Sequence, residues 1–256
     1  MVIVEKLHID NIPLLHVVNQ EYKEKKTPFV IFVHGFTSAK ENNLHYAYFL
    51  AEKGFRVVLP EALFHGERSD TDEVTDLSLK FWQIVINEIN ELEIIKNYFE
   101  ENNLINSEQI GVAGTSMGGI TTLGALTQYE WIKAAVSLMG SPCYTAFLTR
   151  QLQALKQNGV KLPLTEQDIE TQKSKLAKFD LSLHKDKLAK RPLLFWHGER
   201  DQVVPFGPTY QFYKEIIPMY ADHPERLKFI ADAKADHKVS QEGVQALVNW
   251  FDRYLR

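Results

Sequence analysis

Hydrophobic and polar residues follow two alternating patterns along this chain. Short runs rich in β-branched and aromatic residues are typical of strands. Eight such runs occur, at Val2–Ile9, Ile12–Val18, Pro28–Val33, Phe55–Pro60, Gln109–Ala113, Ala134–Met139, Arg191–His197 and Arg226–Ala231. The first two are joined by the turn at Asp10-Asn11 and predict an antiparallel edge hairpin. Pro28–Val33 is apolar on both faces, as expected of a central parallel strand.

Segments with apolar residues at helical spacing separate most of these strands. The predicted helices cover residues 41–53, 76–101, 120–126, 210–217 and 240–255. Strand–helix alternation of this kind predicts an α/β fold, doubly wound, with a mostly parallel eight-stranded sheet covered by helices on both faces. No internal repeat or linker composition divides the chain, so one domain is expected over residues 1–256. Residues 143–190 interrupt the alternation with polar, helical sequence and form an insert.

Composition narrows the classes of protein to consider. Hydrophobic residues make up 45% of the chain and charged residues 24%, which is ordinary for a globular protein. The formal net charge of -4 gives no reason to expect nucleic acid or an anionic membrane as a partner. Cys143 is the single cysteine, which excludes an intrachain disulfide. Without a signal-peptide core or an apolar run of membrane-spanning length, the sequence predicts a soluble, cytoplasmic protein.

The pentapeptide Gly114-Thr115-Ser116-Met117-Gly118 fits G-x-S-x-G between a predicted strand and a predicted helix. A serine on such a sharp turn has little space around it, so residues without side chains are needed on both sides. The turn exposes the hydroxyl above the sheet edge, close to the first N–H groups of the helix. The alternative is a Gly/Ser turn that only allows a helix to pack tightly on a strand.

Two later strands end in residues that a catalytic serine would need. Asp201 follows the strand that ends at His197, and His237 lies in the loop before the last helix. In an open parallel sheet these loops meet at the carboxyl ends of the strands. A serine hydroxyl needs an adjacent base, imidazole suits that role near neutral pH, and a carboxylate orients the imidazole. Asp232 and Asp236 also lie near His237 in the sequence and compete with Asp201.

The order Ser116, Asp201, His237 is that of α/β-hydrolases. From about Pro28 to Arg256, the chain resembles serine esterases of this superfamily near the dienelactone-hydrolase and prolyl-oligopeptidase-like branch. The motifs that carry the resemblance are His34-Gly35-Phe36, 114–119, 197–205 and Asp236-His237. Dienelactone hydrolase has a cysteine nucleophile where this chain has serine, so its lactone substrate is not implied.

The resemblance implies a role for each matching residue. Ser116 is the expected nucleophile, His237 the base and then the acid, and Asp201 the orienting carboxylate. The backbone N–H groups of Phe36 and Met117 are expected to form the oxyanion hole. Family members often carry a lid where this chain has the insert at about 143–190.

Three further residues are candidates for contact with substrate: His34, His65 and Phe147. His34 adjoins the expected oxyanion turn and could instead hold that loop. His65 lies in a loop that resembles one side of such pockets. Phe147 could supply an apolar face over Ser116 together with Leu148, Leu152 and Leu155. No H-x-x-x-H or comparable ligand spacing occurs, so we expect no metal site.

These observations favour a cofactor-free serine hydrolase that cleaves small-molecule carboxylic esters through an acyl-serine intermediate. A peptidase or a thioesterase on the same triad is an alternative, because leaving-group preference depends on the pocket and the lid. A protein of a different class, which binds a ligand on a hydrolase scaffold without turning it over, is another. Neither nucleic acid nor a membrane is an expected partner, and a homo-oligomer is left open.

Overall fold

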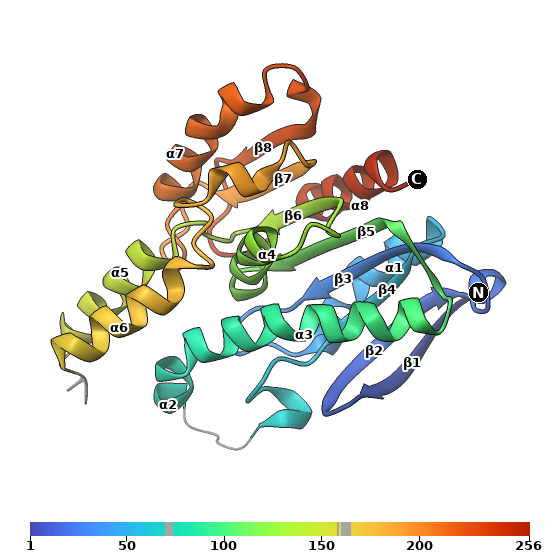
Figure 1. Ribbon diagram of the computed structural model, residues 1–256, viewed down its shortest axis with the longest axis horizontal. Coiled ribbons are helices and arrows are strands. Elements are labelled where there is room, and N and C mark those ends of the chain that lie inside the picture. Colours follow the sequence, from blue (N-terminus) through green and yellow to red (C-terminus); the bar gives the residue numbers. More distant parts are fainter. Residues whose placement is uncertain (70–73, 158, 160–164) are drawn as a thin grey trace.

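The computed structural model describes residues 1–69, 74–157, 159 and 165–256. Across these residues eight strands form one sheet in the order β1-β2-β4-β3-β5-β6-β7-β8 (Figure 1). β1 and β2 are antiparallel to their neighbours and the other strands are parallel, which confirms the predicted fold class. The strands are β1 Val2–Ile9, β2 Ile12–Asn19, β3 Thr27–Val33, β4 Arg56–Pro60, β5 Ile105–Thr115, β6 Ala134–Leu138, β7 Leu193–Gly198 and β8 Leu227–Asp232.

Helices pack on both faces of the sheet, because alternate residues of each central strand point to opposite sides. In β3, Phe29 and Ile31 join one hydrophobic cluster, whereas Val30 and Phe32 join another. The first cluster lies against α3 (Phe81–Glu101), α4 (Met117–Gln128) and α7 (Phe206–Ile216). The second lies against α1 (Leu44–Glu52) and α8 (Gln241–Tyr254).

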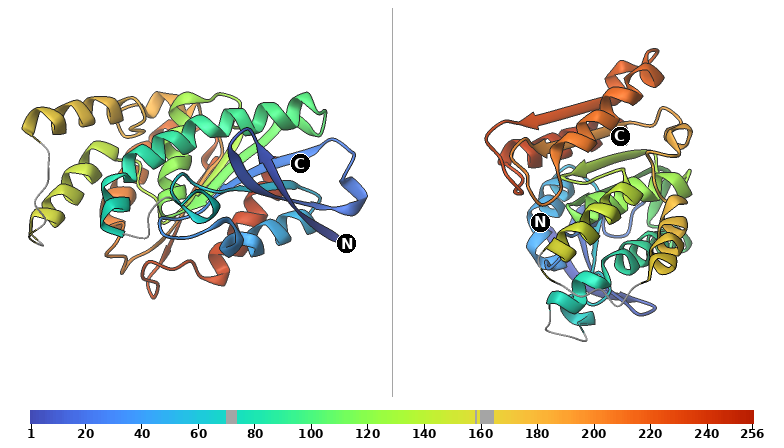
Figure 2. Two further views of the ribbon diagram at one scale, coloured as in Figure 1. Left: turned by 90° about the horizontal axis from the view of Figure 1, so that it is seen from below. Right: turned by 90° about the vertical axis from the view of Figure 1, so that its left-hand side faces the viewer.

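Three further α-helices lie at one end of the sheet: α2 (Val74–Leu79), α5 (Tyr144–Gln157) and α6 (Glu166–Ala177). α5 and α6 belong to the predicted insert and run side by side (Figure 2). The 3-10 helices are η1 Gln20–Tyr22, η2 Lys40–Asn43, η3 Gly66–Arg68, η4 Lys185–Leu188, η5 Ile217–Tyr220 and η6 Pro224–Arg226. Residues 158 and 160–164 of the insert, and 70–72 of the predicted loop 61–72, lie outside the described residues.

Some predicted boundaries were wrong. The expected single helix over 76–101 is interrupted at Lys80, whose N–H donates to the Leu77 carbonyl at 3.0 Å and closes a tight turn. Leu77 and Phe81 on either side of the turn are both buried in the same cluster, so tertiary packing sets this break. α7 begins at Phe206, a turn earlier than expected, where the Phe206 ring stacks on Tyr210. None of the helices within the described ranges is long and apolar enough to cross a bilayer.

Candidate active site

Ser116 occupies the sharp turn between β5 and α4. Its backbone has φ 54° and ψ -113°, a conformation that side-chain-bearing residues rarely adopt. The turn is tight because β5 and α4 approach closely. A Cβ on Gly118 would lie 2.1 Å from the carbonyl oxygen of Val33, and one on Gly114 would lie 2.4 Å from the carbonyl carbon of Gly118. Only glycine fits at these two positions, which is the steric reason for the G-x-S-x-G spacing.

The structure brings Ser116, His237 and Asp201 together from the loops after β5, β8 and β7. The Ser116 hydroxyl donates to His237 Nε2 over 2.8 Å. On the other side of the ring, His237 Nδ1–H donates to Asp201 Oδ2 over 2.7 Å. The His237 side chain is 22% exposed, whereas the Asp201 side chain has no exposed surface. The imidazole therefore links a buried carboxylate to a hydroxyl at the edge of a cavity.

Contacts around Asp201 favour its ionised form. Its Oδ1 accepts the backbone N–H groups of Val203 at 2.9 Å and Val204 at 3.0 Å. His197 Nε2 lies 3.3 Å from Oδ2 and also donates to the Val204 carbonyl at 2.8 Å. Burial alone would raise the pKa of Asp201, but the hydrogen bonds with His197, His237 and the backbone outweigh it and hold this pKa well below its usual range. We therefore expect a carboxylate, not a carboxylic acid, beside His237.

The two predicted oxyanion donors lie close to Ser116. Met117 is the first residue of α4, so its N–H has no acceptor within the helix. Phe36 lines the same cavity as Ser116, and a Cβ on Gly35 would lie 3.5 Å from Ser116 Cβ. Within the described part of the chain, neither of these two N–H groups has a hydrogen-bond acceptor. Both groups are thus available to a ligand oxygen, with the positive end of the helix dipole beside them.

His34 and His65, which were predicted to contact substrate, both form hydrogen bonds within the loops beside Ser116. Neither imidazole lines the cavity at Ser116. His34 Nδ1–H donates to the Gly35 carbonyl at 2.8 Å, and its Nε2 accepts the Ala62 N–H at 3.0 Å. His65 Nδ1–H donates to the Leu63 carbonyl, and its Nε2 accepts the Thr37 N–H at 3.0 Å. Both rings therefore tie the loop after β3 to the loop after β4, the role considered above for His34.

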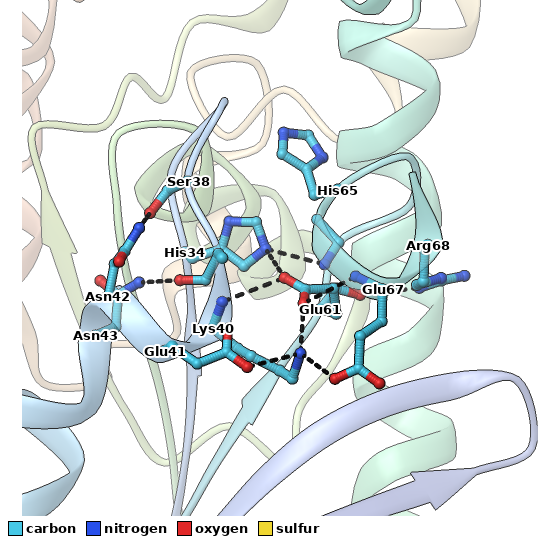
Figure 3. Close-up of polar contacts among 12 residues, drawn as sticks. His34, Ser38, Lys40, Glu41, Asn42, Asn43, Glu61, His65, Glu67 and Arg68 are labelled. Carbon is cyan, nitrogen blue, oxygen red and sulfur yellow. Dashed lines mark hydrogen bonds and ion pairs between the residues drawn. The ribbon is translucent and has the colours of Figure 1, made fainter. Parts of the chain in front are cut away.

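A buried ion pair, which the sequence interpretation missed, holds the same two loops. Glu61 Oε2 accepts a bond from Lys40 Nζ at 2.5 Å, and Glu61 Oε1 accepts the Lys40 N–H at 3.2 Å (Figure 3). Both side chains are at most 1% exposed. Burial would raise the pKa of Glu61, but His34 and Lys40 lower it to about 2. The position of Glu61 in the sequence could have indicated this pair. Glu61 directly follows β4, so it lies at the same edge of the sheet as Ser116.

Three carboxylates gather at this pair and resemble a metal-binding group: Glu41, Glu61 and Glu67. The Lys40 ammonium lies among them, 3.1 Å from Glu41 Oε1 and 2.7 Å from Glu67 Oε1 (Figure 3). The chain thus supplies its own cation at this cluster. We assign the cluster to holding the loops and not to metal binding.

Ser116 opens into a cavity of about 320 Å³, which falls within the usual size range of small-molecule sites. Phe147 forms part of its wall, at the position where an apolar face over Ser116 was predicted. Most of the lining is apolar and consists of Phe36, Phe81, Ile120, Phe147, Ala154, Val203 and Val204. The polar lining residues are Ser78, Ser116, Arg150, Gln151 and Gln202.

Comparison with known proteins identifies the family. The model of the prolyl oligopeptidase family matches residues 83–256, which is more than half of the chain. The chain belongs to the prolyl oligopeptidase family. This membership confirms the predicted class of enzyme, a hydrolase, and the predicted resemblance to the prolyl-oligopeptidase-like branch.

Two relatives match this family member along its full length. A Bacillus subtilis (strain 168) protein named "Putative esterase YitV" is 52% identical over 255 residues, covering 100% of both chains. The Escherichia coli (strain K12) protein named "Esterase YjfP" is 29% identical over 258 residues, again covering 100% of both.

Two solved structures share the fold of this family member. Thermus thermophilus TT1662 superposes with a TM-score of 0.77 at 18% identity, covering 100% of this chain and 99% of the other. A Klebsiella pneumoniae protein described as a "Putative Dienelactone Hydrolase" gives 0.69 at 16% identity, covering 99% and 100%. At these identities the likeness concerns the fold, and it agrees with the predicted α/β-hydrolase arrangement.

Proposed function

We propose that this chain hydrolyses small-molecule carboxylic esters through an acyl-serine intermediate, with Ser116, His237 and Asp201 as its catalytic triad. The observation that carries the proposal is the continuous line of hydrogen bonds from the Ser116 hydroxyl through His237 to Asp201, at 2.8 and 2.7 Å. The names of both full-length relatives include the word esterase, which supports ester substrates over other acyl derivatives.

The geometry suits each step of ester cleavage. Ser116 Oγ attacks the ester carbonyl carbon while its proton passes to His237 Nε2, and the resulting imidazolium is stabilised by the Asp201 carboxylate. Charge that develops on the carbonyl oxygen meets the N–H groups of Phe36 and Met117. The loss of one such donor costs about 2.7–4 kcal/mol in comparable sites. His237 then returns the proton to the departing alkoxide, and a water activated by the same imidazole releases the acid from Ser116.

Peptides and thioesters react by the same steps, so the triad alone does not select among them. Hydrolysis of a matched panel with a common acyl group on phenol, thiol and amine leaving groups separates the three classes. We expect the phenyl ester to have the highest kcat/KM. A ligand-binding protein without turnover would hydrolyse no member of the panel.

Replacement of the nucleophile tests the proposal. Ser116→Ala should lower kcat for p-nitrophenyl butyrate by about 10⁶-fold, the loss measured for comparable serine enzymes. Ser107→Ala is the matched control, because Ser107 lies at the far end of the same strand, β5. A fluorophosphonate should label the wild-type chain at Ser116, as located by mass spectrometry. Turnover retained in Ser116→Ala, or labelling elsewhere, would contradict the assignment.

A further inference from the structure

A second cavity, of about 580 Å³, adjoins the one that contains Ser116. The two cavities share three lining residues, Ser78, Gln151 and Ala154, so they meet at these side chains. Gln151 and Ala154 lie on α5, and Ser78 lies on α2. The second cavity therefore begins where the Ser116 cavity ends, and it extends between these helices toward α6.

The lining of the second cavity is mixed, and its large apolar residues lie on one side. The helices α2, α3 and α5 supply all of its large apolar side chains, Leu79, Trp82, Leu148, Leu152 and Leu155, together with the polar Ser78, Gln83 and Gln151. The part formed by α6 is polar, with Asp168, Thr171, Gln172 and Lys175. Apolar surface therefore lies on the side of α2, α3 and α5, whereas α6 contributes polar residues alone.

Specific contacts fix the side chains at which the two cavities meet. Trp82 Nε1–H donates to Gln151 Oε1 over 2.8 Å, which joins α3 to α5 at the shared residues. The Phe147 ring packs against both Phe81 and Trp82, with centroids 6.2 and 6.1 Å apart. These contacts make the connection a built feature of the packing of α5 on α3.

The position of His237 indicates which part of a bound ester would occupy the two cavities. His237 must reach the oxygen of the leaving alcohol, but it lines neither cavity. The leaving group therefore lies on the imidazole side of Ser116, and the acyl group extends into the cavities. The apolar lining favours a chain that needs no hydrogen-bond partners, since buried amide groups without partners are costly. An aliphatic chain meets this requirement.

We propose that the two cavities together bind the aliphatic chain of medium- to long-chain acyl esters, with the carbonyl at Ser116 and the distal methylenes beyond Ala154. This inference rests on the ester hydrolysis proposed above and names its substrate class. Each methylene moved from water to apolar surface strengthens binding about fourfold. Accordingly, kcat/KM for p-nitrophenyl esters should rise from acetate to octanoate, and rise further or hold its level at dodecanoate.

A bulky residue at the junction tests the proposal. In Ala154→Phe the ring would fill the space where the two cavities meet, so kcat/KM for dodecanoate should fall at least tenfold relative to that for acetate. Ala146→Phe is the matched control, because Ala146 lies on the same helix, is exposed and lines neither cavity. Its dodecanoate-to-acetate ratio should equal that of the wild type.

Two results would overturn the inference: a wild-type enzyme that prefers acetate, or an unchanged ratio in Ala154→Phe. If the wild type hydrolyses no ester, the proposed function fails, and binding of dodecanoate by isothermal titration calorimetry decides the inference separately. In that case, binding that Ala154→Phe weakens at least tenfold and Ala146→Phe leaves intact supports the acyl site. Absent or equal binding in all three proteins rejects it.

Discussion

At the scale of single residues, the surroundings of Asp201 fix both its charge and its direction. One carboxylate oxygen accepts two backbone N–H groups, and the other faces His237. Asp232, which competed for the same role in the sequence, instead accepts the N–H groups of Lys234 and Ala235 within its own turn. Local turns therefore decide that the Asp201 carboxylate, and not that of Asp232, reaches the His237 imidazole.

Asp201→Asn tests the orienting role. The amide keeps the size of the side chain but presents a donor where His237 Nδ1–H needs an acceptor, so the imidazole is held in the wrong tautomer. We expect kcat for a p-nitrophenyl ester to fall by about 10⁴-fold. Asp232→Asn, at the end of the neighbouring strand, should change kcat little. Equal losses in the two variants would show that Asp201 has no special role.

At the scale of elements, the loops after β3 and β4 act as one unit. His34, His65 and the Lys40–Glu61 pair each join a residue of one loop to a residue of the other. Burial lowers the pKa of His65, which keeps its Nε2 free to accept the Thr37 N–H. Because Phe36 lies between His34 and Thr37, these contacts define where its N–H points.

The buried pair should be sensitive to the loss of one partner. Glu61→Gln leaves the Lys40 ammonium without its fully buried counter-charge, and we expect the free energy of unfolding in urea to fall by about 3–5 kcal/mol. Glu67→Gln also removes a carboxylate next to Lys40, but that side chain is 39% exposed, so a loss of about 1 kcal/mol or less is expected. The double variant Glu61→Gln/Lys40→Met should recover part of the loss, and a purely additive result would argue against coupling.

The boundaries of the helices and strands also show which features the local sequence determines. The strands were predictable because buried parallel strands are short apolar runs, and Ser116 was predictable because its glycines satisfy a steric rule. The helix break at Lys80 and the burial of Lys40 were not predictable from the local sequence. A lysine between two helices, or just before one, is normally exposed to solvent. In both cases contacts with distant residues override the local preference.

At the scale of the whole molecule, a buried carboxyl group between two helices links stability to pH. Glu88 of α3 is buried against α4, where its Oε2 accepts the Thr121 hydroxyl at 2.9 Å. Its Oε1 has no partner among the described residues. Burial raises the pKa of Glu88 to about 8, an effect that His34 and Arg68 reduce and Glu91 increases. The folded chain thus favours the protonated acid.

The sign of the effect follows from the two states. An unfolded glutamate ionises above a pH of about 4.3, whereas the folded one stays protonated up to about 8, so stability falls as pH rises between these values. Glu88→Gln removes this cost. The unfolding free energy of Glu88→Gln minus that of the wild type should therefore increase by roughly 1.4 kcal/mol for each pH unit between pH 5 and pH 7. Glu93→Gln, on the exposed face of the same helix, should show a pH-independent difference in urea denaturation.

How the candidate site assembles could be foreseen from topology, but the shape of its pocket could not. Ser116, Asp201 and His237 follow three parallel strands, and parallel strands place their ends at one edge of a sheet. The two cavities meet at side chains that include Ala154 of α5, and α5 is joined to α3 by the hydrogen bond between Trp82 and Gln151. No period in either helix specifies that contact, so the junction of the two cavities was not predicted.

The backbone conformation of Ser116 has a consequence for the stability of the chain. Residues in such rarely populated conformations cost about 1–3 kcal/mol each, and glycine would avoid most of that cost. Selection for folding alone would thus favour a third glycine between Gly114 and Gly118. The hydroxyl that we propose as the nucleophile is therefore held at the expense of thermal robustness.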